Sequence, residues 1–111
     1  IGQIETVTAV ENIDAIAAVD GLDVLFIGPN DLSGSAGRFR EFEHPDVTRL
    51  IERAFEGIRR AGKPAGIIPY GRQSTIDLFR AGYAMVAAST DLSLLRAAAV
   101  SEVRTYREAF G

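Results

Sequence analysis

The sequence predicts an α/β fold built from four strand–helix units. Short apolar runs alternate with segments of helical periodicity, and Gly, Pro or Asp stands at most of the boundaries. The hydrophobic fraction of 47% and the charged fraction of 24% are those of a folded domain, which excludes a disordered tail. Strands that alternate with helices indicate a parallel sheet with right-handed crossovers. Residues 1–111 therefore read as one segment.

The first unit begins with a strand over Ile1–Glu5. A helix is predicted to begin at Thr8, because Thr8 and Glu11 have the spacing of a capping box. Its apolar face repeats at helical intervals, and Asp20-Gly21 ends it. The second strand, Leu22–Ile27, has an apolar core without alternation, as expected for a strand covered by helices. The residues of the helix face are Ala9, Ile13, Ile16 and Ala17.

A polar segment follows Gly28-Pro29 and runs to Glu43, with a short helical turn predicted near Asn30 or Asp31. The next helix begins at Pro45, where a missing amide costs nothing, and ends at Gly62. The remaining predicted elements are a strand over Ala65–Ile68, a helix from about Gln73 to Arg80 that turns Ile76 and Phe79 inward, a strand over Ala84–Ala88 and a helix from Leu92 to about Ala109. Two architectures are compatible with this order: a small open doubly wound sheet, or half of an eight-stranded barrel. A complete barrel needs about 250 residues.

Several classes of function have no support in the composition. The net charge is −3 and no basic run is present, which argues against nucleic-acid binding. No apolar stretch approaches the ~18 residues of a membrane helix. The absence of cysteine excludes a zinc–thiolate site, a disulfide scaffold and a cysteine nucleophile. The chain opens on an apolar strand without an initiating Met, which favours the interpretation that an earlier part is missing.

Sites in parallel α/β folds lie where the strands end, so the carboxyl ends select the candidates. Gln3 and Glu5 lie two apart in the first strand and point to the same side, and Asp31 follows the second strand. Glu5 and Asp31 could ligate a hard divalent ion such as Mg²⁺ or Mn²⁺. The structural alternative is that Asp31 caps a helical turn and Glu5 pairs with an arginine. A general acid–base pair is a third interpretation.

The other candidates carry weaker signals. Gly28-Pro29-Asn30 could let the carboxylate of a ligand approach the backbone, although a plain turn explains the same residues. His44 is the only histidine and precedes Pro45, so we expect it to cap a helix rather than act as a base. Ser89-Thr90-Asp91 is expected to cap the last helix. Arg38 and Arg40 could contact an anionic substrate, although solvated arginines are the default.

The chain resembles the HpcH/HpaI aldolases, metal-dependent (class II) enzymes that act on 2-oxo acids. The resemblance covers essentially all 111 residues, and the joint occurrence of its blocks makes it specific. The blocks are Gln3-Ile4-Glu5-Thr6, Asn12-Ile13-Asp14, Phe26–Ser33, His44-Pro45-Asp46-Val47, Ala61-Gly62-Lys63-Pro64, Gly66-Ile67-Ile68 and Val86-Ala87-Ala88.

The resemblance implies that the chain corresponds to the C-terminal half of a (β/α)8 barrel. It implies that Glu5 and Asp31 are metal ligands for Mg²⁺, Mn²⁺ or Co²⁺, and that Gln3 lies beside metal and substrate. The substrate residues it implies are Gln3, Gly28, Pro29, Asn30, Asp31 and Ile68. The implied reaction is cleavage of 4-hydroxy-2-oxo acids to pyruvate and an aldehyde through a metal-stabilised enolate. The family's general base and enolate-stabilising Arg would belong to the missing N-terminal half.

The resemblance further implies a cytoplasmic homo-oligomer that needs its N-terminal half for activity. One alternative is a citryl- or malyl-CoA lyase. Those enzymes usually lack the Gly-Pro step seen at Gly28-Pro29, so this step favours the aldolases. Another is a truncated, non-catalytic α/β binding module. A Schiff-base aldolase is disfavoured, because the only lysine, Lys63, precedes the third strand at the opposite end of the fold.

Overall fold

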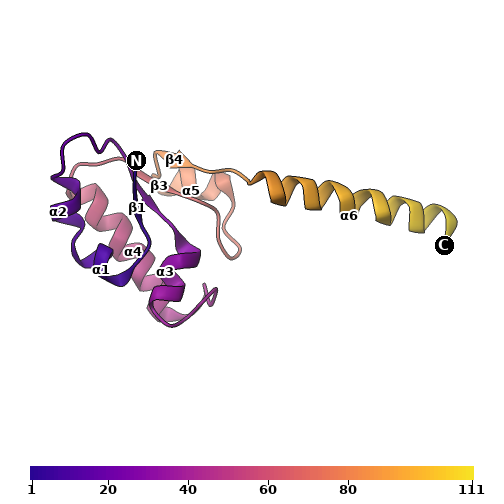
Figure 1. Ribbon diagram of the computed structural model, residues 1–111, viewed down its shortest axis with the longest axis horizontal. Helices are drawn as coiled ribbons and strands as arrows, with labels where there is room; N and C mark the ends of the chain where they lie inside the picture. The colour runs from indigo at the N-terminus through magenta and orange to yellow at the C-terminus, as the bar shows by residue number, and fades with distance from the viewer.

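The computed structural model describes residues 1–111 as a four-stranded sheet with helices packed along it (Figure 1). The four predicted strand–helix units are present, with shorter strands than expected and with additional breaks between helices. The elements in order are β1 (Gly2–Ile4), α1 (Val7–Glu11), α2 (Ile13–Ala17), β2 (Leu25–Ile27), α3 (Pro29–Ser35), α4 (Pro45–Arg60), β3 (Ala65–Ile67), α5 (Thr75–Ala81), β4 (Met85–Val86) and α6 (Asp91–Phe110).

All neighbouring strands are parallel, and their spatial order β1-β2-β3-β4 is the order of the chain. A doubly wound sheet reverses its strand order at a switch point. No reversal occurs here, so successive right-handed crossovers carry the chain in one direction, as they do around a barrel. The strand order therefore favours the half-barrel over the open doubly wound sheet.

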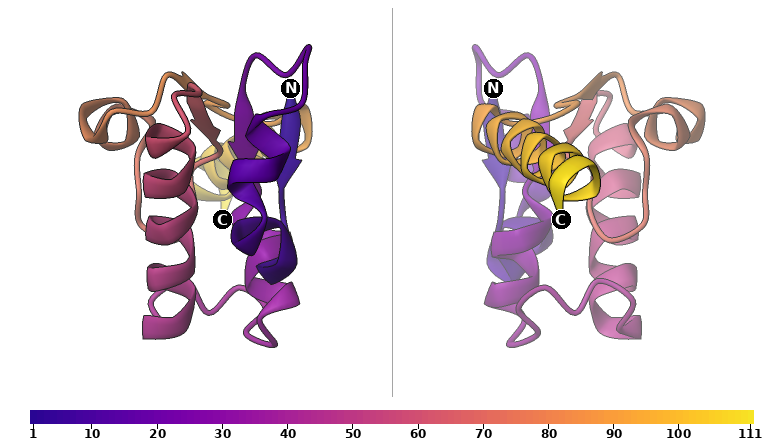
Figure 2. Two further views of the ribbon diagram at one scale, coloured as in Figure 1. Left: turned by 90° about the vertical axis from the view of Figure 1, so that its left-hand side faces the viewer. Right: turned by 90° about the vertical axis from the view of Figure 1, so that its right-hand side faces the viewer.

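One face of the sheet forms the hydrophobic core. Ile4, Ile27 and Ile67 are aligned across three strands and are fully buried. The apolar stripe of α4 packs against this face, and α1 and α2 pack against α4 (Figure 2). The stripe is the one expected from the sequence, and its members Val47, Leu50, Ile51, Ala54 and Ile58 are all buried.

The opposite face of the sheet is much less covered. It carries the alternate residues of each strand, so Gln3, Phe26 and Gly66 are aligned in register. Phe26 is half-buried, Gln3 is exposed, and Met85 on β4 is 37% exposed. The Phe26 ring lies over Gly66, because a Cβ built on Gly66 would stand 2.6 Å from Phe26 Cδ2. The glycine therefore makes room for the ring on this open face.

The first helical segment differs from the prediction. Its N-cap is Thr6, whose hydroxyl accepts a hydrogen bond from the amide of Ala9 at 3.0 Å, so the predicted cap at Thr8 is wrong. The helix also breaks at Asn12, whose Nδ2 donates to the carbonyl of Thr8 at 2.8 Å. A side-chain amide that binds the backbone competes with the helical ladder, which explains the change of direction between α1 and α2.

The helix ends after the second strand follow the sequence more closely. Pro29 opens α3, a seven-residue helix where a short helical turn was predicted, and Pro45 opens α4 as predicted. Gly62 and Gly82 stop α4 and α5 with φ values of 75° and 102°, a region that glycine enters without steric cost. Within α5 the prediction is wrong: Leu78 is buried, whereas Ile76 and Phe79 are 60% and 51% exposed.

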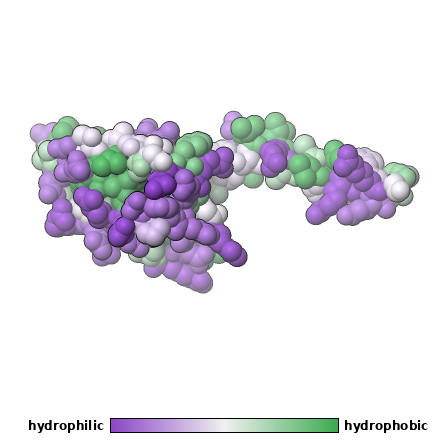
Figure 3. Space-filling model, turned by 90° about the horizontal axis from the view of Figure 1, so that it is seen from below, coloured by the Kyte–Doolittle hydropathy of each residue, from purple (hydrophilic) through white to green (hydrophobic).

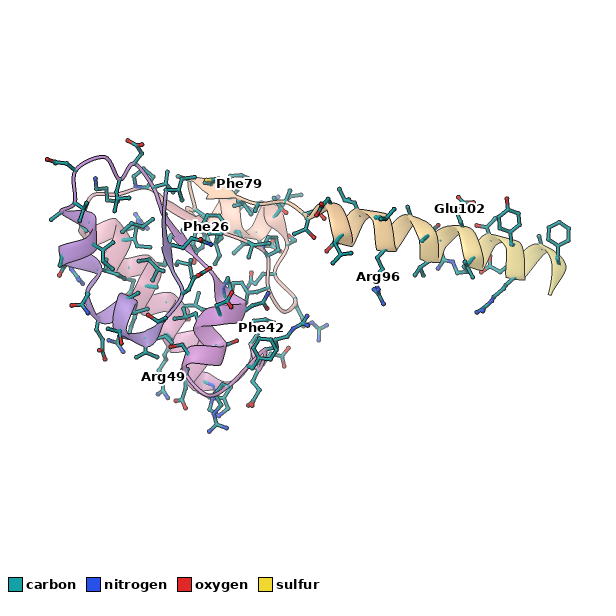
Figure 4. The ribbon with its side chains drawn as sticks, viewed as in Figure 1. Phe26, Phe42, Arg49, Phe79, Arg96 and Glu102 are labelled. Carbon is teal, nitrogen blue, oxygen red and sulfur yellow. The ribbon has the colours of Figure 1, made fainter.

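Helix α6 projects away from the rest of the chain as a single rod (Figure 1). None of its residues is buried, and Leu92, Leu95 and Tyr106 are each more than 60% exposed. Apolar side chains line its surface (Figure 3), and its side chains extend freely, as the labelled Arg96 and Glu102 illustrate (Figure 4). The chain's radius of gyration is 16.9 Å, against about 13 Å for a compact domain of this length. No helix has the length and apolar character needed to cross a membrane.

We expect Gly66→Ala to destabilise the sheet, because the new methyl group would collide with the Phe26 ring. Overpacking of this kind typically costs about 1–3 kcal/mol. The midpoint of denaturant unfolding, compared between variants at the same protein concentration, reports the loss of stability. Gly34→Ala is the matched control, because Gly34 lies in α3 and its added Cβ would meet only the exposed Phe39 ring at 3.3 Å. Equal stabilities for the two variants would contradict this account of Gly66.

Candidate functional site

The carboxyl ends of β1 and β2 lie side by side. The strands are paired in parallel with Ile4 opposite Ile27, and the amide of Gly28 donates to the carbonyl of Ile4 at 3.1 Å. The residue that follows β1 is Glu5, which continues the alternation of Gln3 and so belongs to the open face of the sheet. This arrangement places Glu5 beside the Gly28-Pro29 step, at the end of the sheet where α3 and Asp31 follow β2.

Glu5 occupies space that a side chain at position 28 would otherwise fill. A Cβ built on Gly28 would stand 2.7 Å from Glu5 Oε1 and 2.8 Å from Glu5 Cγ. Gln3 Nε2 donates a hydrogen bond of 2.9 Å to the same Oε1. Gly28 thus has a steric role specific to this position, and Gln3 holds the orientation of the carboxylate.

Asp31 lies in the first turn of α3, where a negative charge is favourable near the helix N-terminus. The N-cap of α3 is Gly28, and no side chain caps that helix, so the alternative that Asp31 caps the turn is not what the structure has. The ion pairs of the chain involve neither Asp31 nor Glu5, so the alternative arginine partner is also missing. Both carboxylates are therefore available to a ligand.

The donor set fits a hard divalent ion in part. Glu5 and Asp31 supply carboxylate oxygens, which Mg²⁺ and Mn²⁺ prefer. No group of three or more His, Cys, Asp and Glu residues is gathered anywhere in the chain. Two carboxylates leave most of six coordination positions to water, substrate oxygens or residues outside this chain. The residues present are therefore compatible with an ion that keeps open positions for a substrate.

A hollow of about 420 Å³ lies at the same end of the sheet, next to Asn30. Its wall combines residues that follow β2, β3 and β4, including Ile68, so two of the predicted substrate residues line one hollow. Tyr70 and Gln73 also line the hollow, and neither was predicted as a site residue from the sequence. The signal in the sequence that could have identified them is their position just after the third predicted strand. Pro29 is buried at the first position of α3 rather than lining the hollow.

Tyr70 is held in the wall by packing. Its ring lies 5.7 Å from that of Phe42, centroid to centroid, at an interplanar angle of 60° (Figure 4 labels Phe42). Burial raises the pKa of the Tyr70 phenol above its ordinary value of 10.0, and the nearby charge of Glu52 adds to the shift. The phenol is therefore protonated at neutral pH and can donate a hydrogen bond.

The remaining predicted residues have structural roles. His44 is the N-cap of α4, where its Nδ1 accepts from the amide of Asp46 at 3.2 Å. Thr90 caps α6 by accepting from the amide of Ser93 at 3.1 Å, and both also line the hollow. Lys63 Nζ donates to the carbonyl of Leu22 at 2.6 Å, at the amino end of the sheet. These interactions confirm the expected caps at His44 and Thr90 and the remote position of Lys63.

The parallel strands in sequential order are those expected of part of an α/β barrel, and comparison with known proteins gives the family. Residues 1–98 match the model of the HpcH/HpaI aldolase/citrate lyase family, and the chain belongs to that family. It is 40% identical over 96 residues to a 5-keto-4-deoxy-D-glucarate aldolase of Enterobacter sp. (strain 638), covering 86% of this chain and 38% of that protein. It is 36% identical over 107 residues to a hydroxypyruvate/pyruvate aldolase of Chromohalobacter salexigens, covering 96% and 42%.

Solved structures confirm the fold class. An HpcH/HpaI aldolase/citrate lyase family protein from Burkholderia cenocepacia J2315 superposes with a TM-score of 0.80 at 32% identity. The alignment covers 95% of this chain and 41% of that one. The four strand–helix units thus resemble half of the family's (β/α)8 barrel, and the chain spans about two fifths of the relatives that it matches.

We expect Gly28→Ala to displace the Glu5 carboxylate and to break its hydrogen bond with Gln3, because the methyl group would overlap Glu5. Alanine tolerates the backbone at this position, where φ is −101°, so the effect is steric and local. The NMR signals of the Gln3 side-chain amide report the loss. In a Glu5→Ala background the same Gly28→Ala change should leave those signals unmoved. A further shift there would show that Gly28 acts on Gln3 by another route.

Proposed function

We propose that this chain supplies the C-terminal half of a metal-dependent aldolase that cleaves 4-hydroxy-2-oxo acids to pyruvate and an aldehyde. The observation that carries the proposal is the pair of available carboxylates at adjacent strand ends, with Glu5 seated over Gly28 and Asp31 without a partner. The hollow beside Asn30 gives the substrate a place at the same rim. Relatives named as aldolases support the reaction class.

Glu5 and Asp31 would hold the divalent ion, which is Mg²⁺, Mn²⁺ or Co²⁺ in this proposal. When bound, such an ion supplies a Lewis acid that stabilises the negative charge of an enolate. Gln3 keeps the Glu5 carboxylate aimed at the open face through its 2.9 Å hydrogen bond. Replacing either carboxylate would remove one of the two negative charges that this chain offers the ion.

The first turn of α3 would bind the carboxylate of the 2-oxo acid. Amides in the first turn of a helix lack intrahelical partners and suit an anion. Gly28 and Pro29 position this turn, and Asn30 and Asp31 contribute the free amides. Ile68, which lines the hollow, would form an apolar wall beside the substrate. Because Glu5 and Asp31 are assigned to the ion in this proposal, proton transfer is assigned to groups from outside this chain.

The proposed partners follow from the surfaces that the fold leaves open. β1 and β4 each pair with a neighbour on one side only, and unpaired strand edges invite further strands. Only 21 of the 111 residues are buried, which is a thin core for a self-sufficient domain. We propose that an N-terminal half-barrel continues the sheet and contributes the general base and an enolate-stabilising arginine. We also propose that the apolar surface of α6 is covered in a cytoplasmic homo-oligomer.

We expect the 111-residue chain by itself to associate or unfold readily and to lack aldolase activity. Joined to the portion of the Enterobacter relative that precedes the matched region, it should release pyruvate from 4-hydroxy-2-oxo acids. A coupled lactate dehydrogenase assay follows the pyruvate. Activity should disappear with a chelator and return with Mn²⁺, Mg²⁺ or Co²⁺. Chelator-resistant activity, or a covalent adduct trapped by borohydride, would contradict the proposal, and turnover of malyl-CoA instead would assign the chain to the CoA lyases.

In the completed enzyme, we expect the site variants to differ in activity in a defined order. Asp31→Asn and Glu5→Gln preserve shape but remove a negative charge from the ion, and each should lower kcat/KM by at least ~10–100-fold, the usual cost of disturbing even the outer surroundings of a metal. Gln3→Ala should be milder, because Gln3 orients without supplying charge. His44→Ala is the control and should leave kcat near that of the parent, since His44 caps α4. Loss of turnover in His44→Ala alone would mean that the site lies elsewhere.

A further inference from the structure

Helix α3, which carries Asp31, is too short to fix its own position. It spans the seven residues Pro29–Ser35, and isolated helices shorter than about 12 residues are marginal in water. Leu32 and Ser33 are fully buried, so one face of the helix is anchored in the core. The placement of Asp31 therefore depends on the contacts that hold α3 against its neighbours.

One of these contacts joins α3 to the loop that follows it. Ser33 Oγ donates to the carbonyl of Asn30 at 2.7 Å and accepts from the amide of Arg40 at 2.9 Å. Arg40 has a φ of 62° and is the only residue other than glycine in the left-handed region. This contact fixes the loop against α3, but it does not link α3 to the segment that carries Glu5.

A second contact makes that link. The amide of Val7, at the first position of α1, donates to Ser35 Oγ at 3.1 Å, across 28 positions of the chain. Val7 also lines a hollow together with Ala36, the C-cap of α3. Figures 1 and 2 show the connection from β1 to α1 running beside α3. The hydroxyl of Ser35 therefore joins α3 to the segment that begins with Glu5.

The spacing of this contact along the chain matches the spacing of the two carboxylates. Ser35 lies four residues after Asp31, so both are on one face of α3, and Val7 lies two residues after Glu5. The hydrogen bond thus turns the Asp31 face of α3 toward the segment that carries Glu5. The amide of Gly28 fastens the same two segments at the strand ends, and Ser35 fastens them again beyond the carboxylates.

We propose that Ser35 is a positioning residue of the metal site, which fixes the separation between the Glu5 and Asp31 carboxylates by holding the amide of Val7. The inference rests on the proposed function, because it takes those carboxylates as the ligands of a divalent ion. Two carboxylates from different segments can hold one ion only at a suitable spacing, and partners outside the ligand set maintain such spacings. Loss of the Ser35 hydroxyl should therefore weaken metal binding more than it slows the chemical step.

The test measures the dissociation constant of Mn²⁺ from the completed enzyme without substrate, using the EPR signal of free Mn²⁺. Ser35→Ala should raise this constant about twofold to tenfold, the factor expected for one hydrogen bond between neutral groups. The kcat at saturating Mn²⁺ should fall by a smaller factor than the affinity. Ser35→Thr keeps the accepting oxygen and should retain the affinity of the parent.

Thr8→Ala is the matched control. It removes an exposed hydroxyl one residue after Val7, and it keeps the Thr8 carbonyl that accepts from Asn12. The dissociation constant of Mn²⁺ should be that of the parent in this variant. A rise equal to that of Ser35→Ala would mean that any lost hydroxyl near the start of α1 disturbs the site, and it would overturn the inference.

Removing the donor instead of the acceptor isolates this hydrogen bond from other effects of the serine. Val7→Pro deletes the amide at the first helical position, where proline is tolerated, and Thr6 before it already has an extended backbone. In the Val7→Pro background, Ser35→Ala should cause no further rise in the dissociation constant. An additive rise would overturn the inference. If Val7→Pro does not fold, Ser35→Ala and Ser35→Thr decide, and equal affinities in those two would overturn it.

A further comparison separates this inference from the proposed function. Asp31→Asn should weaken Mn²⁺ binding more than Ser35→Ala does. If both effects are found but the completed enzyme cleaves no 4-hydroxy-2-oxo acid, the proposed reaction is rejected and the role of Ser35 is retained. If the enzyme is a chelator-sensitive aldolase and Ser35→Ala binds Mn²⁺ as the parent does, the reaction is retained and the role of Ser35 is rejected. Mn²⁺ binding that Asp31→Asn leaves unchanged would reject the metal site and the role of Ser35 together.

Discussion

The structure depends on a single topological constraint: parallel strands joined in sequential order by right-handed crossovers. That constraint puts the crossover helices along one face of the sheet and leaves the other face without a helical layer. Because side chains alternate along a strand, the covered face takes Ile4, Ile27 and Ile67, and the open face takes Gln3, Phe26 and Gly66. Core and candidate site are therefore separated by strand parity, and neither competes with the other for the same positions.

The elements that local chemistry decides were predictable from the sequence. Pro45 can begin a helix but not continue one, so the start of α4 was recognisable. Gly62 and Gly82 enter the left-handed region without cost, so the ends of α4 and α5 were recognisable too. The apolar stripe of α4 followed from helical periodicity because the sheet and helices α1, α2 and α3 together cover it. The strand-end rule likewise placed Glu5 and Asp31 at the same end of adjacent parallel strands, whereas the approach of Glu5 to Gly28 became visible only in the structure.

The elements that depend on neighbours were not predictable. Ile76 and Phe79 lie on an apolar face of α5, but periodicity identifies such a face without telling whether anything covers it. The break at Asn12 depends on its side-chain amide, which donates to a backbone carbonyl rather than to solvent. The cap at Thr6 rather than Thr8 is a choice between two threonines that spacing alone does not make. Arg40 was recognised as a cation, but its left-handed backbone and its link to Ser33 are properties of the folded loop alone.

The hydrogen bond from Lys63 to the carbonyl of Leu22 has a practical consequence for handling the protein. Lys63 is the chain's only lysine, and it lies at the amino end of the sheet, away from the rim that carries Asn30 and Asp31. Reagents that couple to side-chain amines would attach a dye or a surface at that end alone. Immobilised in this way, every molecule would present its rim to solvent in the same orientation, and the label would report on the base of the sheet without obstructing the hollow.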